Sequence, residues 1–249
     1  MTAAFINETV RTILLDIEGT ITPLEFVHNV LFCYASAHVR QFLSQRGSSP
    51  DVRADVAALR QERLVDVRQG LKPPSLRNDT PATDFESLVE YIQWLTERDR
   101  KSTPLKSLQG KVWEEGYRTG ELRSPVFDDV ASALRRWQEQ ARNTCIFSSG
   151  SVLAQKLLFA YTTAGDLTAQ ISRYFDTSEG AKTDPESYVK IARALQQSPS
   201  DAVFISDVSA ELDAAQAAGF WTLLCNRPGN RPQPPNKHVL IFNLDKVFA

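Results

Sequence analysis

Residues 13–20 read Ile-Leu-Leu-Asp-Ile-Glu-Gly-Thr, an apolar run that ends at two acids and is followed by a glycine. The apolar run predicts a buried strand, and the glycine predicts a turn after it. Because side chains alternate along an extended chain, Asp16 and Glu18 are expected on the same side. Two acids at a strand end suit magnesium, and an aspartate there can attack phosphorus. Taken by itself, this stretch fits equally well a strand whose last residues are acidic and solvated.

Three further segments supply polar residues in the order that phosphoryl transfer needs. One apolar run ends in the hydroxyls of Ser148 and Ser149, and a later one ends at Asp207. Lys182 stands between these two runs, among residues typical of turns. In a parallel sheet the carboxyl ends of the strands meet at one edge, and ligands bind there. The sequence therefore predicts that these residues gather with Asp16 at one site.

Strands and helices are predicted to alternate after residue 124. The predicted strands are 13–15, 145–147, 203–206 and 222–224, with a short apolar segment at 239–242, and the predicted helices are 130–141, 152–159, 187–195 and 210–218. Such alternation predicts an α/β fold, a doubly wound parallel sheet with right-handed crossovers. The loop 227–235 is rich in Pro, Gly and Asn, and we interpret it as a surface connection without chemistry.

A helical insert is predicted between the first two strands. More than 130 residues separate Asp16 from Ser148, far more than one crossover helix requires. The helical stripes in this stretch are Val27, Val30, Leu31 and Tyr34, then Val52, Val56 and Leu59, then Phe85, Leu88, Ile92 and Leu95. Residues 70–83 are expected to form a loop. We predict a helical cap, residues 24–124, inserted into a catalytic core of residues 1–23 and 125–249.

The composition limits the class of partner. The chain has 249 residues, of which 42% are apolar, and a formal net charge of −2. These are ordinary globular values without a basic surface for nucleic acid or an anionic membrane, so we expect a small-molecule partner. No apolar stretch approaches the length of about 20 residues that crosses a membrane, and the first residues do not resemble a signal peptide. We expect a monomer in the cytosol, with the nucleus as a further location in a eukaryote.

The cysteines and histidines show no metal-binding pattern. Cys33, Cys145 and Cys225 are far apart in apolar surroundings, and they are predicted to be buried thiols rather than a disulfide framework or a zinc site. The three histidines have no ligand spacing. His38 is interpreted as a packed or surface residue.

A strand-end aspartate, a strand-end serine, a loop lysine and a second strand-end aspartate, in this order, resemble the haloacid dehalogenase superfamily of phosphatases. Over most of its length the chain more closely resembles the enolase-phosphatases, also called acireductone synthases. The motifs that resemble this family are 16–20 with Thr22, Pro23, Phe26 and Val27, then 148–159, then 175–177 with Gly180, Lys182, Ser187 and Tyr188. The most specific features are Glu18, where other superfamily phosphatases have Asp, and the helix 154–159. Ile21, Glu179 and Asp184 depart from the family pattern, which leaves contacts at the edge of the substrate open.

The resemblance implies a two-step reaction in methionine salvage. The implied substrate is 2,3-diketo-5-methylthiopentyl-1-phosphate, which is enolised and then loses phosphate to give the acireductone 1,2-dihydroxy-3-keto-5-methylthiopentene. Asp16 is expected to form an aspartyl-phosphate, and Glu18 to protonate the leaving oxygen and then to activate water. Ser148 and Lys182 are expected to hold the phosphate oxygens. Ser149 and cap residues are expected to contact the carbonyl end of the substrate.

One magnesium ion per subunit is expected at this site. Its expected ligands are Asp16, Asp207, an oxygen of Glu18, a phosphate oxygen and waters. Glu211 follows Asp207 by four positions, and it either reaches the ion through water or is a solvated helix acid. Whether Glu18 or another residue is the base of the enolisation also stays open.

The same residues bear on three other functions. A dehalogenase needs no magnesium and generally lacks the second acid, so Glu18 and Asp207 argue against it. A binding protein on a disabled catalytic scaffold should have lost Asp16, Lys182 or Asp207, and none of them is replaced. Another magnesium-dependent phosphatase of the superfamily, acting on a different small phosphate monoester, remains an alternative.

Overall fold

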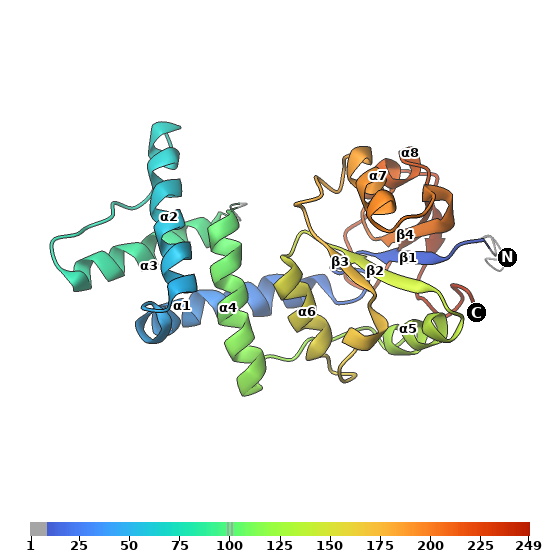
Figure 1. The fold of residues 1–249 in the computed structure, drawn as a ribbon, viewed down its shortest axis with the longest axis horizontal. Coiled ribbons are helices and arrows are strands. Elements are labelled where there is room, and N and C mark those ends of the chain that lie inside the picture. Colours follow the sequence, from blue (N-terminus) through green and yellow to red (C-terminus); the bar gives the residue numbers. More distant parts are fainter. Residues whose placement is uncertain (1–8, 99, 101) are drawn as a thin grey trace. The chain divides into compact units, whose positions relative to one another are not determined.

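The structure is a computed structural model that describes residues 9–98, 100 and 102–249. It divides into two compact units (Figure 1). One unit runs to Val27 and resumes at Gly120, and the other comprises His28–Thr119. The division lies a few residues inside the insert of 24–124 that was predicted from the sequence.

The first unit is built on a six-stranded sheet with the order β3-β2-β1-β4-β5-β6. Its strands are β1 (Thr12–Leu15), β2 (Asn143–Phe147), β3 (Arg173–Phe175), β4 (Ala202–Ser206), β5 (Trp221–Cys225) and β6 (Val239–Ile241). Each described pair of neighbouring strands is parallel. The register places Leu15 opposite both Ile146 and Ile205, so the chain leaves β1, β2 and β4 at one edge of the sheet. The predicted doubly wound parallel sheet is confirmed.

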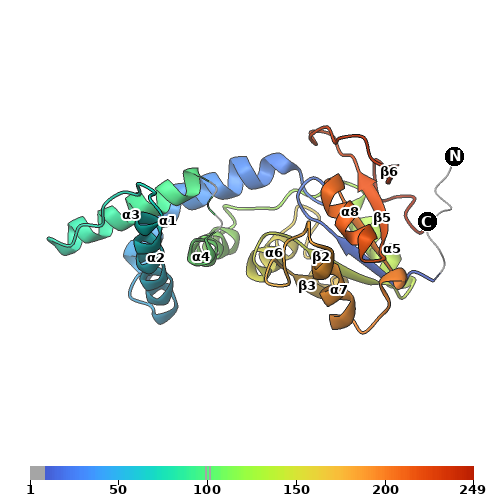
Figure 2. The same ribbon diagram turned by 90° about the horizontal axis from the view of Figure 1, so that it is seen from above.

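Helices cover both faces of this sheet (Figure 1 and Figure 2). They are α5 (Val130–Glu139), α6 (Val152–Ala160), α7 (Pro185–Ala194) and α8 (Ser209–Ala217), with the short 3₁₀ turns η2 (Thr168–Gln170) and η3 (Pro199–Asp201). Helices α5 and α6 pack on one face, and α7 and α8 pack on the other. Because both faces are covered, the central strands β1 and β4 are buried along their whole length, as is usual in parallel sheets.

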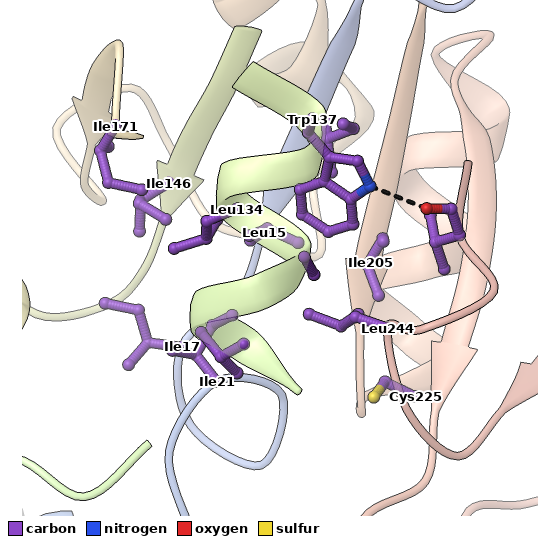
Figure 3. Packing of buried hydrophobic residues seen from close by; sticks show 14 of the residues in the cluster. Leu15, Ile17, Ile21, Leu134, Trp137, Ile146, Ile171, Ile205, Cys225 and Leu244 are labelled. Atoms are coloured by element: carbon purple, nitrogen blue, oxygen red, sulfur yellow. Dashed lines mark hydrogen bonds between the residues drawn. The ribbon is translucent and has the colours of Figure 1, made fainter. Parts of the chain in front are cut away.

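The core beneath α5 joins the sheet to the C-terminal segment. Figure 3 shows Leu134 and Trp137 of α5 beside Ile146 of β2 and Ile205 of β4. The indole Nε1 of Trp137 donates to the carbonyl of Val247 at 2.8 Å, so this fully buried ring keeps its one polar group paired. The core on the opposite face is rich in aromatic rings from β2, β4 and α7.

The second unit is helical. Its helices are α1 (Phe32–Arg46), α2 (Pro50–Arg68), α3 (Pro81–Glu97) and α4 (Thr103–Thr119), and the π-helix η1 (Phe26–Leu31) leads into it. A buried charged group lies inside this unit: Asp66 accepts from the hydroxyl of Tyr91 at 2.8 Å and is 2.6 Å from a guanidinium nitrogen of Arg100. Among the described residues, no helix is both long enough and apolar enough to span a membrane.

Three details of the secondary structure differ from the sequence prediction. The predicted stripe that begins at Val27 holds only in part: Val27 and Leu31 are buried, but Val30 is 41% exposed, because η1 is a π-helix whose wider turn breaks the spacing of an α-helix. The predicted loop 70–83 is shorter, because Thr80 caps α3, which begins at Pro81. Strand β3 was not predicted, since three residues are too few to show a period.

The structure corrects the prediction for one cysteine and shows where two of the histidines lie. Cys145 and Cys225 are buried thiols, as predicted, but Cys33, the second residue of α1, is exposed. His38 is half-buried, with its Nδ1 2.8 Å from the carbonyl of Tyr34. His238 is buried.

Candidate active site

Asp16 and Asp207 each follow a central strand directly. Asp16 comes after β1 and Asp207 after β4, and each residue is 5% exposed. The amide of Asp16 donates to the carbonyl of Ile205 at 2.9 Å, which fixes the end of β1 against β4. The structure therefore brings these two predicted site residues to the same edge of the sheet.

A tight turn follows Asp16 and contains Glu18. Several amides of the turn donate to the carbonyl of Ile17. Gly19 has a φ of 73°, and a Cβ added to it would lie only 2.4 Å from Oδ2 of Asp207, so the turn passes this close only with glycine. Glu18 is half-buried and, like Asp16, lies beyond the end of β1, so that these two acids lie on the same side stays a prediction.

Lys182 is paired with two acids. Its Nζ lies 2.5 Å from Oδ1 of Asp16 and 2.6 Å from Oε2 of Glu211, and its side chain is 9% exposed. The rings of Phe147 and Phe204 lie 5.9 and 5.8 Å from Nζ. Burial by itself lowers the pKa of Lys182, but the charges of Asp16 and Glu211 outweigh burial and raise this pKa above its usual value. Lys182 is therefore a buried, fixed cation beside Asp16.

The loop that contains Lys182 is held by α7. The hydroxyl of Tyr188 donates to the main-chain carbonyl of Lys182 at 2.7 Å. Asp184 caps α7 by accepting from the amide of Glu186 at 3.0 Å, as predicted for the Asp-Pro pair at the start of this helix. Nothing in the sequence pattern indicated the contact of Tyr188 with Lys182, because it depends on how the loop folds back onto the helix.

Glu211 belongs to the same cluster. Its side chain is 14% exposed, and it accepts from the hydroxyl of Ser206 at 3.0 Å in addition to its pairing with Lys182. Burial and the charge of Asp16 raise the pKa of Glu211, while Lys182 opposes the shift. The alternative that Glu211 is a solvated helix acid is therefore wrong.

The cluster has more acids than bases. Burial first, and then the charges of Asp16 and Glu211, raise the pKa of Asp207 to about 7. Three carboxyl groups thus lie near Lys182, which pairs directly with two of them, Asp16 and Glu211. This excess of negative charge would repel a phosphate ester unless a further cation offset it.

Ser148 and Ser149 follow β2, the strand beside β1. Ser148 is 3% exposed, and its Oγ accepts from the amide of Gly150 at 3.2 Å, whereas Ser149 is exposed. Nε2 of Gln155 donates to the carbonyls of Gly150 and Phe175, each at 2.8 Å. Gln155 thereby ties the serine loop to the end of β3.

The donor atoms of the cluster suit magnesium. Asp16 and Asp207 offer hard carboxylate oxygens, and Mg²⁺ in proteins is usually bound by one or two carboxylates together with waters and substrate phosphate. No three His, Cys, Asp or Glu side chains of the described residues are grouped so that they would hold a metal ion by themselves. The side chains of the protein therefore fit a magnesium ion that takes its remaining ligands from main-chain oxygen, water and substrate.

Two residues of the loop after β5 also reach the turn after Asp16, and no pattern in the sequence indicated them. Arg227 is 5% exposed, and its Nε donates to the carbonyl of Thr20 at 3.1 Å. Nδ2 of Asn230 donates to the carbonyl of Gly19 at 2.9 Å. The interpretation of 227–235 as a surface connection is wrong for these two residues, because their side chains turn inward while the Pro-Gly pair between them stays exposed.

Comparisons with known proteins identify the family. Residues 10–219 match the model of the haloacid dehalogenase-like hydrolases. The chain is 50% identical over 238 residues to the enolase-phosphatase E1 of Synechococcus elongatus, and the match covers 96% of this chain and 98% of that protein. The chain belongs to the enolase-phosphatase E1 family.

Other members and a solved structure agree. The enolase-phosphatase E1 of Drosophila willistoni is 38% identical over 243 residues, which cover 96% of this chain and 97% of that protein. The crystal structure of the UTR4 protein of Saccharomyces cerevisiae superimposes with a TM-score of 0.76 at 35% identity, covering 94% of this chain and 98% of that chain. The resemblance to enolase-phosphatases within the haloacid dehalogenase superfamily is confirmed.

Proposed function

We propose that this protein is an enolase-phosphatase that converts 2,3-diketo-5-methylthiopentyl-1-phosphate to 1,2-dihydroxy-3-keto-5-methylthiopentene and phosphate in methionine salvage. The observation that supports this activity best is the 50% identity to an enolase-phosphatase E1 over nearly the whole chain. The buried cluster of Asp16, Lys182, Glu211 and Asp207 supplies the groups for the chemistry.

In the phosphatase step, Asp16 attacks the phosphorus. A bond forms between its carboxylate oxygen and phosphorus, and the ester bond to the substrate breaks. Lys182 and the hydroxyl of Ser148 hold the transferring oxygens, and Ser149 contacts the substrate beside them. Glu18 gives a proton to the leaving oxygen and then takes one from the water that releases phosphate from Asp16.

In the enolase step, a proton leaves the carbon that bears the phosphate ester, and the neighbouring carbonyl oxygen gains one. Glu18 is the candidate base, because it is a half-buried carboxylate on the turn next to Asp16. This step needs no nucleophile at phosphorus. The two steps can therefore be separated by substitution.

The proposal includes one magnesium ion, for which Asp16, Asp207 and an oxygen of Glu18 are the ligands. When bound, the ion would supply positive charge at the phosphate, where the three carboxylates outnumber Lys182. The monomeric state, the cytosolic location and the role of His28–Thr119 as a cap stay predictions.

The experiment that tests the function offers the purified protein the diketone phosphate and a panel of sugar phosphates. We expect phosphate release from the diketone phosphate with magnesium, none in excess chelator, and little with calcium, whose coordination shell is larger and looser. Faster release from a sugar phosphate would favour the alternative of another superfamily phosphatase. Full activity in chelator would exclude the magnesium-dependent mechanism.

Two substitutions separate the steps. Asp16→Asn should abolish phosphate release but retain exchange of the proton at the ester carbon in deuterated water, followed by nuclear magnetic resonance. Glu18→Gln should impair both, because an amide neither accepts that proton nor delivers one to the leaving oxygen. Undiminished exchange in Glu18→Gln would assign the base of the first step to another residue.

A further inference from the structure

We propose that Arg227 and Asn230 are positioning residues for the reaction. They hold the main chain of Gly19 and Thr20, and through it they fix the orientation of Glu18. The catalytic part of this inference rests on the proposed function, whereas the bracing of the turn does not.

Arg227 is a rigid support for the turn. Its two terminal nitrogens pair with both carboxylate oxygens of Asp129 at 2.8 and 2.9 Å, and the two side chains are only 3% and 10% exposed. Its guanidinium also lies 4.5 Å from the centre of the ring of Phe127. With this fork and stacking fixed, the remaining Nε–H is directed at the carbonyl of Thr20, at 3.1 Å.

Asp129 is itself held from a third direction. Its Oδ2 accepts from the amide of Leu244 at 2.6 Å, and a terminal nitrogen of Arg227 also donates to the carbonyl of Phe242 at 3.3 Å. The pair thus joins the start of α5 and the C-terminal segment to the turn. A support anchored at several points can hold a main-chain carbonyl without moving with it.

Asn230 holds the neighbouring carbonyl. Its Nδ2 donates to Gly19 at 2.9 Å and to the carbonyl of Cys225, at the end of β5, at 3.2 Å. A Cβ added to Gly19 would lie 2.9 Å from Oδ1 of Asn230 as well as 2.4 Å from Oδ2 of Asp207. The backbone at Gly19 is therefore enclosed between the Asn230 amide and the Asp207 carboxylate.

The other amide atom of Asn230 points to a role beyond stability. Its Oδ1 is buried and has no hydrogen-bond partner in the described structure. An unpaired buried acceptor lowers stability, so it is a cost at this position rather than a gain. The Asn230 side chain instead fixes the position of Gly19, the residue directly after Glu18.

The position of Glu18 matters because proton transfer depends steeply on geometry. A displacement of about 1 Å of a catalytic group can cost about a hundredfold in rate. Loss of one of the two supports should allow a smaller displacement, and we expect a fall of about tenfold in kcat.

Asn230→Ala tests the proposal, with Asn236→Ala as its matched control. Asn236 lies in the same loop, but it is exposed, and its sequence neighbours Pro234 and His238 are its hydrogen-bond partners within the described part of the chain. We expect Asn230→Ala to lower kcat for phosphate release from the diketone phosphate about tenfold, with KM within about twofold of the wild type. Amide hydrogen exchange in peptides containing residues 16–22 should become faster. Asn236→Ala should match the wild type in all three measurements.

Arg227→Lys provides a second variant that keeps a cation opposite Asp129. A lysine lacks the fork that serves Asp129 and Thr20 together, so faster exchange at 16–22 and a lower kcat are expected here too. A kcat within about twofold of the wild type in both variants would overturn the proposal, as would a lower kcat without faster exchange at 16–22. If the wild type released no phosphate, the proposed function and the catalytic role of these residues would both be wrong. Faster amide exchange at 16–22 in the two variants would still show that Arg227 and Asn230 hold the turn.

Discussion

Two groups of buried charges lie in the same α/β unit, and they differ in balance. In the pair of Arg227 and Asp129, one cation faces one anion, both carboxylate oxygens are paired, and each guanidinium nitrogen donates a hydrogen bond. In the catalytic cluster, Lys182 serves both Asp16 and Glu211, and Asp207 adds a third acid whose pKa is raised to about 7. Both groups are shielded from water, so burial alone does not distinguish them.

The difference shows where the molecule can accept a ligand. A balanced pair gains nothing from a further charge, and removing either member leaves the other buried without a partner. An unbalanced cluster is destabilised by its own excess and is relieved by a cation. Substitutions should therefore act in opposite directions on stability in the two groups.

The largest effect on stability is expected from breaking the balanced pair. Arg227→Met leaves the Asp129 carboxylate buried and unpaired, which should lower the free energy of unfolding by about 3–5 kcal/mol. Urea denaturation measures this loss. The double variant Arg227→Met with Asp129→Leu should recover most of it, and a loss below about 1 kcal/mol in the single variant would show that the pair is not balanced as described.

Removing the one cation of the catalytic cluster should instead act on the rate. Lys182→Ala is expected to lower kcat about 10²- to 10³-fold, the range for a group aimed at developing charge. The exposed Lys190, which donates to the carbonyl of Glu179, is the matched control, and Lys190→Ala should retain wild-type kinetics. If Lys182→Ala raised only KM, Lys182 would bind substrate without stabilising the transition state.

Removing an acid from the same cluster should stabilise the metal-free protein. The pKa of Asp207 is about 7 in the folded state against 3.8 for an ordinary aspartate, so the native state holds a proton that the unfolded state has lost between these values. Asp207 therefore lowers stability increasingly as pH rises from about 4 to about 7, and the full penalty is present above pH 7. In excess chelator at pH 8, Asp207→Asn should raise Tm by about 3–6 °C.

The pH dependence is the control for that prediction. The difference in Tm between Asp207→Asn and the wild type should shrink as pH falls and vanish near pH 4, where both side chains are neutral. A calorimetric scan across this range measures it. A variant that is less stable than the wild type at pH 8 would mean that Asp207 is balanced in the metal-free state.

The smallest effect on kcat is expected from Tyr188, which holds the main chain of Lys182. Tyr188→Phe keeps the ring and removes only the hydroxyl that donates to the carbonyl of Lys182, so kcat should fall about three- to tenfold, which corresponds to about 1 kcal/mol. Tyr174→Phe is the control, because the Tyr174 hydroxyl is buried without a partner in the described structure. In a Lys182→Ala background Tyr188→Phe should change nothing further, and an unchanged additional loss there would show that Tyr188 acts on another group.

Local patterns were sufficient to predict the strand ends and the start of α7. The apolar runs before Asp16, Ser148 and Asp207 predict the strands. The rule that parallel strands end at the same edge of a sheet predicts that these three residues lie at one edge. The capping acid Asp184 and the proline after it mark where α7 begins. These features depend only on residues close in sequence or on a general rule of topology.

The supports of the site could not be predicted in this way. Arg227 meets Asp129 and Asn230 meets Gly19 across long separations in sequence, and no period or motif encodes such a meeting. Glu211 was ambiguous for a related reason: an acid in the first turn of a helix is equally usual in solvent, and only the fold brings Lys182 to it. The prediction that Cys33 is buried was wrong because apolar neighbours in the sequence do not show which side of a helix a residue occupies.

The long insertion has a consequence for how the chain is made. β1 emerges first, yet its sheet partners lie far downstream, since Thr12 pairs with Asn143 and Ala202. At ordinary rates of translation the strand that bears Asp16 waits on the order of ten seconds for its first neighbour. During that interval an apolar segment at the ribosome lacks its sheet, and independent folding of the intervening helices would bring its flanks closer before β2 arrives. The order of synthesis thus makes the helical unit a candidate first domain to fold, and the catalytic sheet the last to close.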